Sequence, residues 1–177
     1  MLRVASLSLL ICIFLLSGCA TQYPNQNVQG QRFPNVTGES LEGKPYTIPS
    51  DFSGKPVLFL IGYKQDSQFD IDRWLIGLDM TKTAIDVYEL PTIQGLAPRM
   101  FQTTINDGMR AGIPKPLWKG VITIYAGGES VQAFTGNQNP NNARVALLDE
   151  EGVVRWFYDE GFAVPALNAL RETISDL

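Results

Sequence analysis

The chain has 177 residues, with 14 basic and 18 acidic side chains, a formal net charge of −4, two cysteines and no histidine. The lack of histidine excludes Ser-His-Asp and Cys-His catalysis and histidine-based sites for zinc, copper or haem. No basic cluster is present in the sequence, which argues against nucleic acid or an anionic membrane surface as a partner.

The N-terminal residues have the pattern of a bacterial export signal. Arg3 precedes an almost entirely apolar run over residues 9–16, and this run is shorter than the roughly 20 residues of a membrane span. The sequence Leu16-Ser17-Gly18-Cys19 that ends it resembles the lipobox of bacterial lipoproteins. The resemblance implies a signal peptide over residues 1–18 and a lipid on Cys19, which becomes the new N-terminus. The alternative is an ordinary signal peptide with a chance cysteine.

The predicted mature chain has 159 residues, which suits a single domain, and a net charge of −5 from 13 basic and 18 acidic side chains. Cys12 leaves with the signal and an acylated Cys19 has no free thiol, so no cysteine remains for redox chemistry or disulfides. Ala20 follows Cys19, whereas aspartate there retains lipoproteins of the enterobacterial type in the inner membrane. The resemblance therefore implies an outer-membrane anchor facing the periplasm.

The segment between the anchor and the first apolar cluster is polar. Residues 21–32 are rich in Asn and Gln, and Val28 is the one buried-type side chain among them. This composition predicts a flexible tether over residues 19–32 and a folded domain over residues 33–177.

Apolar periodicity in the domain predicts alternating strands and helices. The unbroken apolar run at 57–61 predicts a strand buried on both faces, and the 3–4 residue spacing at 71–78 predicts an amphipathic helix. In the same way, the helix at 98–110 is expected to have one face formed by Met100, Phe101, Thr104, Ile105 and Met109. The predicted strands are 45–48, 57–61, 85–90, 121–125, 144–148 and 153–158, and the predicted helices are 67–79, 98–110 and one that begins at Pro165.

The order of these elements predicts an α/β fold. Alternation favours a parallel sheet with helices on both faces, and the turn Asp149-Glu150-Glu151-Gly152 predicts a hairpin that adds an antiparallel edge. Residues 54–74 and 143–170 resemble the thioredoxin fold in its peroxiredoxin-related form, which implies a three-layer α/β/α sandwich with a mixed central sheet. Within it, residues 147–156, with Arg155-Trp156, and residues 160–163 are similar to the mitochondrial ATP synthase assembly factor ten family.

The loop that carries cysteine in redox thioredoxins contains none here. It is Tyr63-Lys64-Gln65-Asp66-Ser67-Gln68, and the spacing of Ser67 and Asp70 predicts a capping box at the start of the next helix. The proline that precedes the hairpin in redox members is also missing beside Ala143. We therefore expect the fold to be retained and oxidoreductase activity to be lost.

Three other patterns leave alternatives open. Asp66, Asp70 and Asp72 could bind calcium or act as paired carboxylates, but acids in a first helical turn are favoured by the helix dipole alone. Lys64 and Ser67 could form a catalytic pair, although nothing marks an oxyanion hole. The amides of residues 137–142 could bind sugars, and such runs are also common in solvated connections.

We interpret the chain as a non-catalytic, lipid-anchored periplasmic domain that binds an envelope protein and has an assembly or chaperone-like role. No catalytic residue, cofactor or metal site is predicted. The alternative is a small-molecule binder or a carboxylate-based enzyme that uses the groove near Tyr63 and Arg144. The candidate binding surface consists of Tyr63, Lys64, Asp66, Arg144, Arg155 and Trp156.

The anchor gives the first testable prediction. Cys19→Ser removes the only thiol that can accept the lipid after signal cleavage, so the variant should move from the membrane fraction to the soluble fraction. Fractionation of cells that express each form measures this. A variant that stays in the membrane fraction contradicts the lipobox interpretation.

Overall fold

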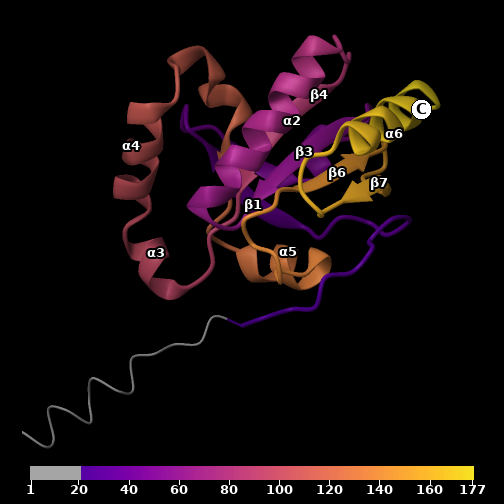
Figure 1. Cartoon of the computed structure of the whole chain (residues 1–177). Helices are drawn as coiled ribbons and strands as arrows, with labels where there is room; N and C mark the ends of the chain where they lie inside the picture. Colours follow the sequence, from indigo (N-terminus) through magenta and orange to yellow (C-terminus); the bar gives the residue numbers. More distant parts are fainter. Residues whose placement is uncertain (1–20) are drawn as a thin grey trace, which may run out of the picture.

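A four-stranded mixed sheet forms the centre of the computed structural model, which describes residues 21–177 (Figure 1). β3 pairs in parallel with β4 and antiparallel with β6, and β6 pairs antiparallel with β7. The predicted hairpin is confirmed, but its first strand lies inside the sheet and only its second strand forms the edge. The strand order is β4 (Asp86–Pro91), β3 (Val57–Gly62), β6 (Arg144–Leu148) and β7 (Val154–Tyr158).

A second, antiparallel sheet lies beside β4. Its order is β2 (Pro45–Ile48), β1 (Val36–Ser40) and β5 (Ile122–Thr123). Parallel bridges from Glu89 to Val121 and from Thr92 to Ile124 connect its β5 end to β4. The sequence did not predict β1, because Val36 is its only large apolar side chain.

Helices cover both faces of the central sheet, so the predicted three-layer α/β/α arrangement is confirmed. Leu58 and Leu60 of β3 face one cluster with α2 (Gln68–Met80) and α6 (Val164–Ser175). Phe59 and Ile61 face the opposite cluster, which includes Val131 of α5 (Gly128–Thr135). The unbroken apolar run of β3 is therefore buried on both sides.

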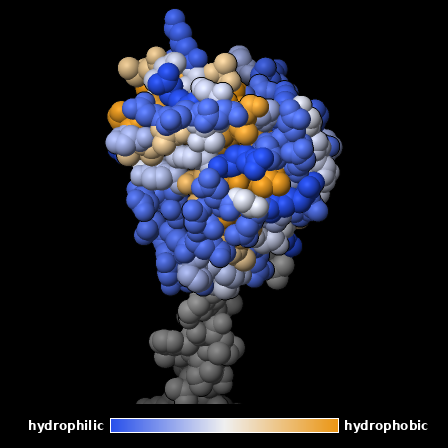
Figure 2. All heavy atoms as spheres, turned by 90° about the vertical axis from the view of Figure 1, so that its right-hand side faces the viewer, coloured by the Kyte–Doolittle hydropathy of each residue, from blue (hydrophilic) through white to orange (hydrophobic). Residues whose placement is uncertain are grey.

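The α2–α6 layer is closely packed around one tryptophan. Trp74 is fully buried, and its ring meets Trp156, Tyr158 and Phe162 at centroid distances of 5.9, 6.0 and 5.3 Å in edge-on geometry. A side chain at Gly77 would place its Cβ 2.9 Å from Leu167, so glycine permits the approach of α6. The aromatic residues of β7 thus contribute to the core. Figure 2, which shows the molecule from the right-hand side of Figure 1, presents a mostly hydrophilic surface with small apolar areas.

The connection from β4 to β5 differs from the single helix predicted over 98–110. It contains α3 (Leu96–Met100), α4 (Gln102–Gly112) and the 3₁₀ helix η3 (Lys115–Gly120), with a break at Phe101. The expected apolar face is wrong, because Met100 is 80% and Phe101 60% exposed, and the buried residue of α4 is Asn106. Asn106 accepts a hydrogen bond from Tyr125 at 3.0 Å, so polar contacts hold α4 to the domain.

None of the helices between residues 21 and 177 is long and apolar enough to cross a membrane.

The segment before the domain also differs from the flexible tether predicted over residues 19–32. Residues 21–32 lie along the domain, with Val28 fully buried beside Phe33 in the core. Gln26 donates to the carbonyls of Ala133 and Phe134 at the end of α5, at 2.9 and 2.7 Å. Hydrogen bonds from amide side chains, and not the burial of a large apolar area, thus hold this polar segment on the domain. The signal peptide and Cys19 lie outside the described residues.

A buried carboxylate connects the layers across long stretches of sequence. Asp70, on the first turn of α2, is 5% exposed and accepts hydrogen bonds from the backbone N–H of Ala143 at 2.9 Å and of Phe162 at 2.6 Å. These amides precede β6 and α6. Asp70 therefore fixes the start of α2 against two segments that follow it by more than 70 residues.

Removing this carboxylate should destabilise the fold strongly. Asp70→Ala leaves two backbone N–H groups without their charged acceptor, and we expect the free energy of unfolding to fall by about 3–5 kcal/mol. Asp72→Ala is the matched control, because Asp72 is exposed and accepts only from Gln68 one turn earlier. Its cost should stay below about 0.5 kcal/mol. Urea unfolding of the Cys19→Ser mature chain measures both, and equal losses contradict this role of Asp70.

Candidate binding cleft

The loop between β3 and α2 closes on itself through a serine. It contains the 3₁₀ helix η2 (Gln65–Ser67), and Ser67 is buried with its hydroxyl donating to the carbonyl of Lys64 at 2.6 Å. A Cβ at Gly62 would lie 2.6 Å from this hydroxyl, so Ser67 packs directly on the end of β3. Its side chain makes no hydrogen bond to the start of α2.

The predicted capping box is therefore wrong. An N-cap serine needs extended backbone geometry to reach the amides of the next turn, whereas Ser67 has helical dihedrals (φ −65°, ψ −17°) because η2 runs directly into α2. The acid of the predicted box, Asp70, faces inward to Ala143 and Phe162 instead.

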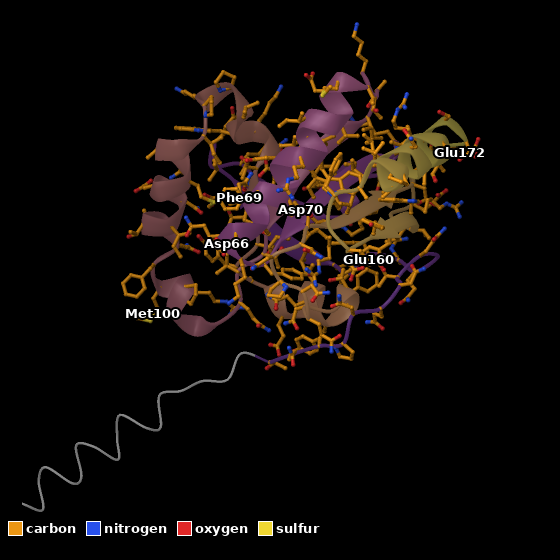
Figure 3. All side chains as sticks on the ribbon, viewed as in Figure 1. Asp66, Phe69, Asp70, Met100, Glu160 and Glu172 are labelled. Atoms are coloured by element: carbon orange, nitrogen blue, oxygen red, sulfur yellow. The ribbon has the colours of Figure 1, made fainter. Side chains whose placement is uncertain are left out.

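The three aspartates near the start of α2 do not form a common site. Asp70 is buried and Asp66 is exposed on η2 (Figure 3), whereas Asp72 accepts a hydrogen bond from Gln68 at 2.9 Å. Within residues 21–177, no group of three or more Asp, Glu, His or Cys side chains is arranged to hold a metal ion.

An open cleft of about 650 Å³ lies at the carboxyl ends of the parallel strands β3 and β4. Loops at this edge of an α/β sheet commonly form binding sites. Four parts of the chain contribute to its walls: the β3–α2 loop, the β4–α3 loop with α3, α5 with the loop after it, and the N-terminal segment. The lining residues are Thr21, Gln22, Tyr63, Lys64, Ile93, Gln94, Pro98, Gln132, Asn137 and Pro140.

Tyr63 forms a rigid wall of this cleft. Its hydroxyl lies 2.5 Å from the Thr135 hydroxyl and 3.3 Å from the Val131 carbonyl, both on α5. Burial raises the pKa of Tyr63 above its ordinary value, so the phenol is neutral at physiological pH. Its ring face lies 4.9 Å from the guanidinium of Arg144, a cation–π contact.

Arg144 is an internal support of the cleft and not part of its surface. It is fully buried, so the prediction that Arg144 lies on the binding surface is wrong. Its guanidinium donates to the carbonyls of Asn139 at 2.6 Å and Asn142 at 2.9 Å, and to the side chain of Asn25 at 3.3 Å. Arg144 therefore orders the 136–142 loop from below.

The charge of Arg144 is balanced without a direct ion pair. Among the described residues, Arg144 Nε and Asp159 Oδ2 are buried with no hydrogen-bond partner. Burial raises the pKa of Asp159, and the nearby Arg144 charge counteracts this rise. Each of the two groups favours the charged form of the other.

The other predicted surface residues are separated. Tyr63 and Lys64 line the cleft, whereas Asp66, Arg155 and Trp156 do not. Arg155 is exposed on β7 and pairs with Asp149 at 2.8 Å. Trp156 is partly buried and stacks on Tyr158. The structure thus brings two of the six predicted residues to the cleft surface and places Arg144 beneath it.

The sequence points to the amides of residues 137–142 but not to Gln94 and Gln132, which form an amide wall together with Asn137. Asn137 donates to the carbonyl of Thr21 at 2.9 Å and to Gln132 at 2.7 Å, which joins the N-terminal segment to α5. The available signal was composition, because both the 21–32 and 136–142 segments are rich in amides. Composition alone does not place the two segments side by side.

The chemistry of the lining is neutral and polar. Lys64 is its one charged side chain, and no carboxylate is among the lining residues. The amides of Gln22, Gln94, Gln132 and Asn137 can each donate and accept hydrogen bonds. Such a wall can bind peptide groups or hydroxyls through paired donors and acceptors.

The fold defines the class of this domain as thioredoxin-like. The thioredoxin domain of a thiol-disulfide oxidoreductase from Bacteroides vulgatus is similar over 84% of this chain and 99% of its own, with 17% identity and a TM-score of 0.54. The exposed lipoprotein thioredoxin of Streptococcus pneumoniae is similar over 81% and 100%, with 14% identity and a TM-score of 0.55. Copper-bound yeast Sco1 is similar over 86% and 96%, with 13% identity and a TM-score of 0.55.

These likenesses establish the fold and nothing finer, because all three identities are below 20%. No protein-family model matches the sequence, and no curated protein sequence matches it. The comparisons therefore do not support the similarity to the ATP synthase assembly factor ten family, which depends only on the sequence of residues 147–156 and 160–163.

The role of Arg144 can be tested by removing its guanidinium group while keeping an unbranched apolar side chain. Arg144→Met leaves the carbonyls of Asn139 and Asn142 without their donor, so we expect a loss of about 2–4 kcal/mol in the free energy of unfolding. Arg155→Met is the control, since its ion pair is half exposed and should contribute less than about 1 kcal/mol. Similar losses in the two variants, measured by urea unfolding, disprove the supporting role.

Proposed function

We propose that this chain is a lipid-anchored protein of the bacterial cell envelope whose thioredoxin-like domain binds a segment of a partner protein in the cleft. The single observation that carries the proposal is the cleft lining, with four amide side chains, one lysine and no carboxylate. Amides match the alternating donors and acceptors of a peptide backbone. Such a wall fits a protein that binds a partner protein, in assembly or as a chaperone.

Redox chemistry is not part of the proposed role. The β3–α2 loop carries Ser67, hydrogen-bonded to Lys64, and residues 20–177 contain no cysteine. A thiolate is the nucleophile that disulfide exchange and peroxide reduction require. The domain therefore uses the fold without the reaction of the oxidoreductases that it resembles.

The lipobox at residues 16–19 supports the anchored location. One of the similar structures is itself described as an exposed lipoprotein thioredoxin, so a lipid anchor is compatible with this fold. Ala20 after the lipidated cysteine favours the outer membrane over the inner membrane. We propose that the domain faces the periplasm.

The amide wall also favours a second candidate, a small polar ligand such as a sugar. Gln132 and Asn137 are already oriented by each other and by the N-terminal segment. A preformed group of amides suits hydroxyl recognition as well as peptide recognition.

Site-specific photocrosslinking in living cells tests the proposal. A photoreactive phenylalanine derivative at Gln94, in the cleft wall, should yield one discrete protein adduct. The same group at Glu172, exposed on α6 at the far side of the molecule (Figure 3), should yield none. Equal adducts from both positions contradict the cleft as the binding site. No adduct at Gln94, together with a bound metabolite in native mass spectrometry, favours the small-ligand candidate.

A further inference from the structure

We infer that the domain lies directly on the membrane, with the exposed side chains of Met100 and Phe101 inserted into the lipid surface. The partner of this surface is the bilayer itself. The inference rests on the proposed lipid anchor at Cys19 and adds an orientation and a second contact with the membrane, formed by the end of α3 and the residue after it.

The first observation is that the chain is held to the domain almost as far as the anchor. Asn137 binds Thr21 and Tyr23 through hydrogen bonds to backbone atoms of 2.9 and 2.8 Å. The Tyr23 hydroxyl donates to Glu129 on α5 at 2.8 Å. Only two peptide steps separate Thr21 from Cys19, and an extended chain spans at most about 3.6 Å per residue. Thr21 therefore lies within about 7 Å of the lipid-bearing residue.

The second observation is where residue 21 lies. Thr21 and Pro98 of α3 line the same cleft. In Figure 1 the described chain starts at the lower end of the molecule, near α3 and α5, and Figure 3 places Met100 at that same end. A bilayer that holds Cys19 must therefore lie next to the end of the domain that carries α3.

The third observation is the chemistry of this end. Met100 is 80% and Phe101 60% exposed, although both are large and apolar. Residues 90–106 contain no acidic side chain, in a chain that has 18 of them, and Arg99 is their only basic one. Arg99 donates to the Tyr125 carbonyl at 3.0 Å, which fixes the short helix to the domain. An apolar, nearly uncharged projection is suited to the interface of a bilayer.

Another exposed apolar surface provides the comparison. Phe69, Ile76 and Met80 are 70%, 58% and 78% exposed on the outer side of α2. This helix runs toward the upper end of the molecule in Figure 1, away from residue 21. A residue at the end of α2 should therefore remain in water when the anchor is in the bilayer.

Site-specific fluorescence on the lipidated full-length protein tests the orientation. The mature lipoprotein has no free thiol, so Met100→Cys and Met80→Cys each introduce a unique site for an environment-sensitive NBD label at nearly equal exposure. Each labelled protein is placed in phosphatidylethanolamine–phosphatidylcholine vesicles with and without a doxyl-lipid quencher. We expect a blue-shifted emission and at least two-fold stronger quenching at position 100 than at position 80.

Flotation of the same vesicles distinguishes a failure of the proposed orientation from a failure of the proposed lipid anchor. Protein that floats but shows equal quenching at the two positions overturns the orientation and leaves the anchor intact. Protein that does not float shows that Cys19 carries no lipid anchor, which overturns the proposed anchoring and the orientation with it. Unquenched labels at both positions on floating protein likewise overturn the insertion of α3.

Discussion

The structure depends most on the carboxylate of Asp70. It accepts hydrogen bonds from Ala143 and Phe162, which belong to segments 73 and 92 residues further along the chain. These bonds fix α2 against the start of β6 and against the chain that enters α6. Trp74 and Gly77 then bring the aromatic side chains of β7 and the helix α6 into one closely packed layer. The position of α2 in turn sets η2 and Tyr63, and thereby one wall of the cleft.

The opposite wall depends on the close approach of the N-terminal segment to the end of α5. Gly136 has a positive φ of 79°, and a Cβ there would lie 2.3 Å from Asn25 Cα. Only glycine accommodates both this backbone geometry and this contact. With the segment in place, Asn25 and the carbonyls of the 136–142 loop surround the Arg144 guanidinium. The cleft is thus built around a buried cation that supports it without being exposed in it.

These features connect the proposed function to the membrane. The cleft is neutral apart from Lys64 and is lined with amides, which suits the recognition of a polar backbone. Its wall includes Thr21, two residues from the proposed anchor, and Pro98 of the projecting α3. Under the proposed anchoring, the cleft and the anchor share one end of the molecule. The proposal therefore places the cleft at the bilayer surface.

The sequence by itself determined the main elements of the sheet. The apolar run of β3, the amphipathic α2 and the Asp149–Gly152 turn of the β6–β7 hairpin depend on local patterns, and these predictions are confirmed. The lack of a redox cysteine in the β3–α2 loop can also be read from the sequence without a structure. Only the tertiary structure decided the roles of the polar residues. Asp70 is a long-range link and not a helix cap, Arg144 is an internal support, and residues 21–32 are a segment bound along the domain and not a free tether. Each depends on hydrogen bonds between residues far apart in the chain, and such partners leave no periodic trace in the sequence.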